Sequence, residues 1–104
     1  ILRRRVRGYT RNVGEFKIGR TSTPEARSNQ PDYVNAYDEM IVIYETRFIE
    51  HANEVERSLI YYFSTHDDNR NFRGGGGGPS GRAPHYVYVV RSKTLLDTIA
   101  SFFK

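Results

Sequence analysis

The sequence predicts a small α/β (α+β) domain in which helices flank a mainly antiparallel sheet of three to four strands. Three observations support this prediction. Residues 40–44 and 85–90 are apolar runs of strand length, rich in β-branched and aromatic side chains. Residues 50–63 carry apolar side chains at helical spacing. The chain has 104 residues, which is enough for a single domain with one core.

The first quarter of the chain predicts a β-hairpin followed by a short helix. Residues 6–9 begin an extended segment, and residues 11–14 predict its turn because Asn and Gly tolerate positive φ angles. Residues 15–19 alternate polar and apolar side chains, which is typical of a second strand. Thr23 is expected to cap the following helix, with Pro24 in its first position.

The centre of the chain predicts a buried strand and a long amphipathic helix. Pro31 interrupts the first helical pattern. The continuous apolar run at residues 40–44 indicates a well-buried strand. Residues 50–63 predict the clearest helix of the chain. The expected inner face of this helix consists of Ala52, Val55, Leu59, Tyr62 and Phe63.

A polar loop separates this helix from the last two predicted elements. The loop covers residues 64–84, and its glycine-rich part, residues 73–84, is expected to be flexible because five consecutive glycines have no side chains to pack. Residues 85–90 predict a strand. Ser92 is expected to cap a final helix with an apolar inner face.

Charge is distributed unevenly along the chain, whose net charge is +4. Residues 1–27 hold eight basic and two acidic groups, residues 28–72 three basic and nine acidic, and residues 73–104 five basic and one acidic. Of the 16 basic residues 13 are Arg, whose planar fork matches phosphate oxygens. Basic flanks around an acidic centre suit a phosphodiester site with a bound metal, and they suit charge balancing within the domain equally well.

Several classes of protein are disfavoured by composition. The absence of Cys removes disulfides and thiolate metal sites, so nothing indicates secretion. No apolar run is long enough to cross a bilayer, and the Arg-rich start lacks the apolar centre of a signal peptide. We therefore expect an intracellular protein of the cytoplasm or nucleus with no membrane partner. The chain begins at Ile1 rather than Met, which leaves room for a fused partner domain.

Four short features follow one another in a suggestive order. Gly8 and Tyr9 lie on the first predicted strand, and Lys17-Ile18-Gly19 lies on the second. Arg27 follows Gly19 by eight residues on the first helix, and Glu56 lies on the long helix. This order and spacing over residues 8–72 resemble the GIY-YIG endonuclease superfamily. The resemblance is to the branch of phages and large viruses in which Lys-Ile-Gly replaces Tyr-Ile-Gly.

The resemblance implies metal-dependent hydrolysis of DNA phosphodiester bonds. Tyr9 would take a proton from water, with Lys17 helping it or acting as the base itself. Arg27 would hold the non-bridging phosphate oxygens, and Glu56 would hold one Mg²⁺ ion. These four side chains are expected to line one concave surface. The side chains expected to bind nucleic acid around it are Arg3, Arg4, Arg5, Arg7, Arg11, Arg20 and Arg73.

The chain also departs from the family pattern. The Ile of Gly-Ile-Tyr is absent, and Lys17 stands where the second Tyr would be. The family's later Asn is matched only by Asn69 or Asn71, neither of which lies in a recognisable motif. These departures keep two alternatives open. One is a non-catalytic nucleic-acid-binding module of the same fold, and the other is a protein-interaction domain with a basic face.

Overall fold

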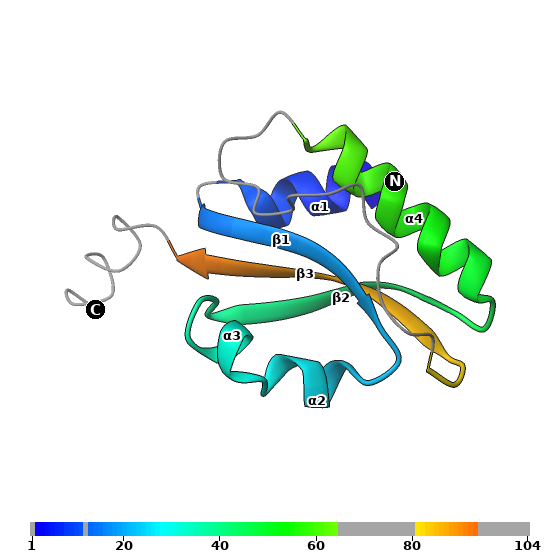
Figure 1. The fold of residues 1–104 in the computed structure, drawn as a ribbon. Helices are drawn as coiled ribbons and strands as arrows, with labels where there is room; N and C mark the ends of the chain where they lie inside the picture. Colours follow the sequence, from blue (N-terminus) through cyan, green and yellow to red (C-terminus); the bar gives the residue numbers. More distant parts are fainter. Residues whose placement is uncertain (1, 12, 65–80, 94–104) are drawn as a thin grey trace.

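The computed structural model describes residues 2–11, 13–64 and 81–93 of the chain, and Figure 1 shows their arrangement. These residues form four helices and three strands. The expected small α+β architecture is confirmed, with three strands in the described sheet. The elements are α1 (Leu2–Thr10), β1 (Val13–Thr21), α2 (Pro24–Ser28), α3 (Pro31–Val34), β2 (Glu39–Thr46), α4 (Ile49–Tyr62) and β3 (His85–Lys93).

The sheet is antiparallel and has the order β1-β3-β2, so the last described strand lies at its centre. Residues 87–90 of β3 are at most 1% exposed, because helices cover the central strand on both faces. Val87 and Val89 point to one face, while Tyr88 and Val90 point to the other. This two-sided burial explains the uninterrupted run of apolar and aromatic residues in the strand.

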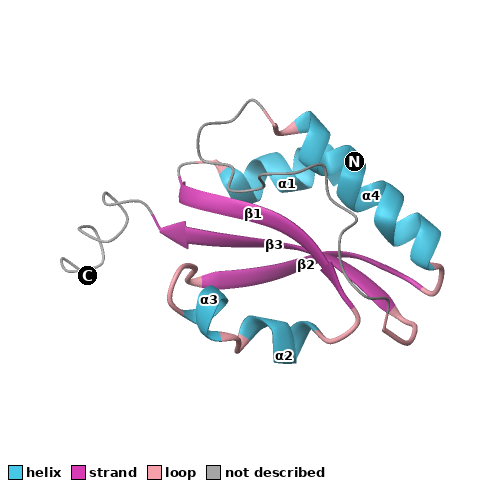
Figure 2. Ribbon diagram, viewed as in Figure 1, coloured by secondary structure: helices cyan, strands magenta, loops and turns pink. Residues whose placement is uncertain are grey.

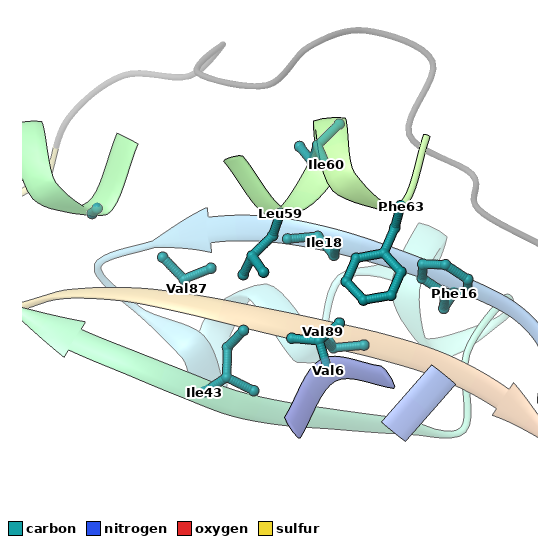
Figure 3. Packing of buried hydrophobic residues seen from close by; sticks show 10 residues of the cluster. Val6, Phe16, Ile18, Ile43, Leu59, Ile60, Phe63, Val87 and Val89 are labelled. Carbon is teal, nitrogen blue, oxygen red and sulfur yellow. The ribbon is translucent and has the colours of Figure 1, made fainter. Parts of the chain in front are cut away.

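The sheet separates two layers of helices. Helices α1 and α4 cover the face of Val87 and Val89, and the short helices α2 and α3 lie against the opposite face (Figures 1 and 2). The larger core lies under α1 and α4 and contains Val6, Phe16 and Phe63 (Figure 3). Phe16 and Phe63 meet edge to face, with ring centroids 6.1 Å apart. We call these the α4 face and the α2/α3 face of the sheet.

The predicted N-terminal hairpin is wrong, because residues 2–10 form helix α1 instead of a strand. Leu2, Val6 and Tyr9 recur at helical spacing, and Val6 is fully buried against the sheet. Arg has a high helix propensity, so the Arg residues between them are compatible with a helix. The strand over residues 15–19 is confirmed as part of β1, but its partner is β3, whose paired residues lie 69 to 75 positions later in the chain.

The strand predicted over residues 40–44 is confirmed as β2, but it is an edge strand and is not well buried. Ile43 is its one buried residue, and Val42 is 39% exposed. The pairing register with β3 shifts between Val42 and Tyr44. Arg5 of α1 donates a hydrogen bond of 3.3 Å to the carbonyl oxygen of Ile43. This bond ties α1 to the irregular part of the strand.

The helix predicted over residues 50–63 is confirmed within one residue at each end as α4. Its buried side is turned slightly from the expected one. Val55 and Tyr62 are only partly buried, whereas Glu56 and Ile60 join the buried residues Ala52, Leu59 and Phe63.

The helix α2 begins with Pro24 in its first turn as expected, but the Thr23 side chain makes no capping hydrogen bond. The hydroxyl of Thr21 accepts a hydrogen bond of 3.0 Å from the Thr23 backbone N–H. After the predicted break at Pro31, the chain forms a further short helix, α3.

Some expectations concern residues outside the described part of the chain. These are the flexibility of the glycine-rich loop, Asn69, Asn71, Arg73 and the final helix beyond Lys93. Ser92 itself lies in β3, where its hydroxyl accepts a hydrogen bond of 2.9 Å from the Glu15 backbone N–H. Among the helices of the described residues, none combines the length and apolar character that crossing a bilayer requires.

Candidate functional site

Four side chains from four elements meet on the α2/α3 face of the sheet. Tyr88 of β3 and Tyr33 of α3 are hydrogen-bonded through their hydroxyls at 2.7 Å. Arg27 of α2 donates a hydrogen bond of 3.4 Å to the Tyr88 hydroxyl. The ammonium group of Lys17 on β1 lies 5.6 Å from the centroid of the Tyr33 ring, which is a cation–π distance. We call Lys17, Arg27, Tyr33 and Tyr88 the sheet-face cluster.

The position of Gly19 makes this cluster possible. Gly19 pairs directly with Tyr88 across the β1–β3 ladder. A Cβ atom at position 19 would lie 2.3 Å from the Tyr88 hydroxyl oxygen and 2.4 Å from Cζ of the ring, far inside van der Waals contact. The absence of a side chain at this position therefore lets the Tyr88 ring cross β1 and bring its hydroxyl to Tyr33 and Arg27.

Burial and hydrogen bonding determine the protonation of the cluster. Burial, together with the hydrogen bond to Tyr33, raises the pKa of Tyr88 well above its ordinary value, and the Arg27 guanidinium offsets only part of this rise. Burial alone would lower the pKa of Arg27, but its interactions with Tyr33 and Tyr88 raise it above the ordinary value. Near neutral pH Tyr88 is thus a neutral phenol that orients a charged Arg27.

The two cations of the cluster have no carboxylate partner among the described residues. Tyr33 is 8% exposed and Tyr88 is fully buried, whereas Lys17 and Arg27 each keep part of their surface in solvent. A guanidinium carries five N–H donors, and phenol oxygens occupy only some of those of Arg27. The cluster therefore presents two positive charges, one of them held by neutral hydroxyls, which is an arrangement suited to an anion such as phosphate.

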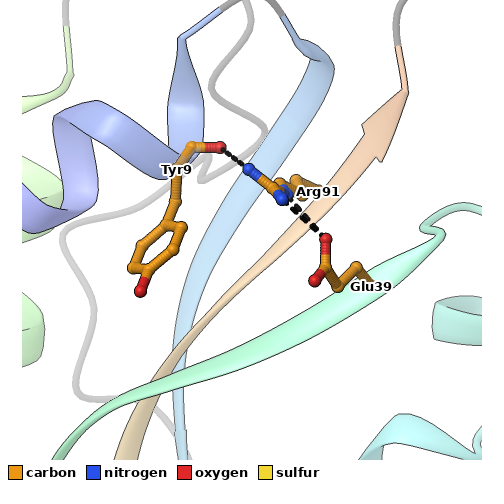
Figure 4. A network of polar contacts seen from close by, with 3 residues as sticks. All are labelled: Tyr9, Glu39 and Arg91. Atoms are coloured by element: carbon orange, nitrogen blue, oxygen red, sulfur yellow. Dashed lines mark hydrogen bonds and ion pairs between the residues drawn. The ribbon is translucent and has the colours of Figure 1, made fainter. Parts of the chain in front are cut away.

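Tyr9 lies apart from this cluster. It is part of α1, and its ring packs at the margin of the core beneath α1 and α4. Arg91 of β3 donates a hydrogen bond of 3.0 Å to the Tyr9 carbonyl oxygen and two to Glu39, at 2.7 and 2.9 Å (Figure 4). The Arg91 guanidinium also lies 5.6 Å from the Tyr9 ring centroid. These contacts fasten α1 to the sheet.

Glu56 is likewise on the α4 face. It belongs to the buried side of α4 and is 7% exposed, so its expected position at the margin of the core is confirmed. The sheet lies between α4 and α2 (Figure 1), and therefore between Glu56 and Arg27. The expectation that Tyr9, Lys17, Arg27 and Glu56 line one concave surface is wrong. The structure brings Lys17 and Arg27 together and leaves the other two across the sheet.

The implied magnesium ion can be compared with this geometry. Within residues 2–11, 13–64 and 81–93, no three His, Cys, Asp or Glu side chains converge in a way that could hold a metal ion. A metal ion on Glu56 would be separated by the sheet from a phosphate on Arg27. The residues therefore do not fit one Mg²⁺ ion shared between Glu56 and a phosphate held by Arg27.

The described Arg residues expected around the site do not surround the sheet-face cluster. Arg3, Arg4, Arg5 and Arg7 are exposed on α1, which lies on the α4 face, and Arg11 is exposed just beyond that helix. Strand alternation directs Arg20 to the α4 face, because it follows the buried Phe16 and Ile18 at two-residue steps. The basic surface is therefore not a rim around one cleft.

Sequence patterns did not indicate the two tyrosines of the cluster. Tyr33 follows the helix-breaking Pro31, in a segment for which the sequence predicts neither a helix nor a strand. Tyr88 was part of a predicted strand, but the sequence did not reveal its pairing with Gly19. The glycine at position 19 is the sequence feature that could have indicated this contact, because a glycine inside a strand often marks the close approach of another group.

Comparison with known families agrees with this fold. The chain matches the T5orf172 domain over residues 7–100, which is most of its length. This family is phage-associated and related to nuclease-like folds, so the phage-associated side of the resemblance is supported, whereas membership of a specific GIY-YIG family is not. No curated protein and no solved structure matches the chain. The match over residues 7–100 makes this chain a member of the T5orf172 domain family.

Proposed function

We propose that this domain binds DNA and that Lys17 and Arg27 hold backbone phosphates on the α2/α3 face. The main observation is a pair of cations, Arg27 bonded to the Tyr88 hydroxyl and Lys17 over the Tyr33 ring, with no carboxylate partner among the described residues. Phosphate contacts supply most of the affinity and position a protein on nucleic acid. The high Arg content and the family's relation to nuclease-like folds support this proposal.

The test is the salt dependence of binding to a fluorescently labelled DNA duplex. Each phosphate contact contributes about 0.9 to the slope of log affinity against log salt concentration. The double variant Lys17→Ala/Arg27→Ala should therefore flatten the slope by roughly two units and weaken binding at low salt. Arg27→Lys keeps the charge but loses the planar fork, so its affinity should lie between those of the wild type and Arg27→Ala.

Arg57→Ala is the matched control. Arg57 is an exposed cation on α4, across the sheet from the sheet-face cluster. It should change duplex affinity far less than Arg27→Ala does. Equal effects of the two variants would mean that net charge alone governs binding, and the proposed site would be abandoned. A domain that captures an acidic protein but no DNA would point to the protein-interaction alternative.

Magnesium-dependent cleavage of DNA is a second candidate function, and the nuclease-like relationship of the family favours it. Plasmid nicking with Mg²⁺ or Mn²⁺ tests this candidate, because a relaxed circle reports a single broken phosphodiester bond. We compare the wild type with Glu56→Gln and with the exposed neighbour Glu54→Gln. Cleavage that only Glu56→Gln abolishes would support a catalytic carboxylate at position 56. A wild type that binds DNA without nicking it would exclude the cleavage function and retain only the binding function.

A further inference from the structure

The α4 face carries a second feature that the sheet-face cluster does not use. A pocket of about 400 Å³ lies between the start of α1 and the end of α4. It is lined by Arg3, Ser58, Tyr61, Tyr62 and Ser64, and none of these residues is acidic. This volume lies within the range of sites for small organic ligands.

The pocket has one fixed and one exposed aromatic ring. Tyr62 packs edge to face against the fully buried Phe63, with ring centroids 4.9 Å apart. The guanidinium groups of Arg3 and Arg7 lie 4.6 and 5.5 Å from the centroid of the Tyr62 ring, and Arg7 also donates a hydrogen bond to the Tyr62 hydroxyl. Tyr61 is 82% exposed. The Tyr61 ring is therefore exposed to solvent, and the next residue, Tyr62, holds the guanidinium groups of Arg3 and Arg7.

We infer that this pocket is a binding site for one unpaired nucleotide of a nucleic-acid strand, with Tyr61 stacking on the base and Arg3 and Arg7 binding the adjoining phosphate. Exposed aromatic rings next to cations are the usual means of holding single strands, because every base has a face that can stack. A paired base presents no free face to such a ring. The inference rests on the proposed DNA-binding function, but it concerns the opposite face of the sheet and a different form of the strand.

The experiment measures the affinity of the full chain for a labelled single strand of thymidines and for a duplex. Tyr61→Ala should weaken single-strand binding about tenfold, since stacking on one aromatic ring is worth roughly 1–3 kcal/mol. Tyr61→Phe keeps the ring and should bind like the wild type. Phe48→Ala is the matched control, because Phe48 is also an exposed aromatic residue, at 61%, but lies at the N-terminal end of α4, whereas Tyr61 lies at its C-terminal end. Duplex binding should be the same for all three variants.

The two proposals fail in different ways. If Tyr61→Ala binds the single strand as tightly as the wild type does, the nucleotide site is refuted, whatever Lys17→Ala/Arg27→Ala does to the duplex. The same holds if Phe48→Ala weakens single-strand binding as much as Tyr61→Ala. A loss of duplex affinity in Lys17→Ala/Arg27→Ala that Tyr61→Ala does not share supports two separate sites. A wild type that binds neither single strand nor duplex refutes both proposals.

Discussion

Replacing Gly19 by Ala is the sharpest test of how the sheet-face cluster is built. A Gly-to-Ala change inside a regular strand is ordinarily stabilising by roughly 0.5–1 kcal/mol, because Gly loses more backbone entropy on folding. At position 19 the added Cβ would lie 2.3–2.4 Å from the end of the Tyr88 ring, whereas ordinary contact begins at 3.4 Å. The ring would have to move by about 1 Å, yet Tyr88 is fully buried and hydrogen-bonded to Tyr33.

The expected net effect is destabilisation by about 2 kcal/mol. Overpacking of a filled site costs roughly 1–3 kcal/mol, and loss of the Tyr33–Tyr88 hydrogen bond costs about 1 kcal/mol more, against the smaller entropic gain. For a domain of this size, that loss corresponds to a fall in Tm of roughly 10 °C. Urea unfolding followed by far-UV circular dichroism measures it directly. Because Tyr88 also orients Arg27, duplex affinity should fall as well.

Gly8→Ala is the control for this prediction. A Cβ at Gly8 in α1 would meet nothing within 4 Å, so the change should raise the free energy of unfolding by roughly 0.5–1 kcal/mol. In a Tyr88→Ala background the cost of Gly19→Ala should largely vanish, because the clashing ring is gone. If Gly19→Ala stabilises the domain as Gly8→Ala does, Tyr88 does not cross β1 and the cluster described above is not formed.

Two further predictions concern the contacts around the site. Because the pKa of Tyr88 is raised in the folded state, its contribution to stability is complete below about pH 10, the ordinary Tyr value, and is lost as the pH rises from there toward the folded pKa. Urea unfolding between pH 8 and 11 should therefore show that the free energy of unfolding falls more steeply with pH in the wild type than in Tyr88→Phe, and equal slopes would contradict the assignment. Arg91→Lys should lower the free energy of unfolding, measured by urea unfolding, by about 1 kcal/mol, because one ammonium group cannot replace the three hydrogen bonds to Tyr9 and Glu39, two of which face solvent. An unchanged stability would mean that this contact does not hold α1 in place.

Much of the architecture could be predicted because it follows from local patterns. The strand at residues 85–90 is a continuous run of β-branched and aromatic residues, and the helix at residues 50–63 has strong apolar periodicity; both lie close to the predicted bounds. The N-terminal segment could not be predicted in the same way. Residues 2–10 contain four Arg and only three apolar side chains, so their conformation depends on the docking of Val6 into the core.

The candidate site was only partly predictable. Motif order predicts that Lys17 and Arg27 act together, and they do converge, because a short connection between β1 and α2 keeps them on the same face. Glu56 was expected beside them from family resemblance. Its helix follows an edge strand and returns over the opposite face, and neither composition nor spacing reports which face a helix takes.

Three properties follow from the amino-acid sequence alone: the fold class, the apolar residues of the long helix and of the strand at residues 85–90, and the excess of Arg suited to phosphate. These properties depend on residues that are close together in the chain. The folded core is needed to place β3 between β1 and β2, to set Gly19 opposite Tyr88, and to bring Arg27 to Tyr33 and Tyr88. Such contacts join residues as many as 80 positions apart, and their partners are chosen by shape and burial in the folded core, which no local pattern of residues encodes.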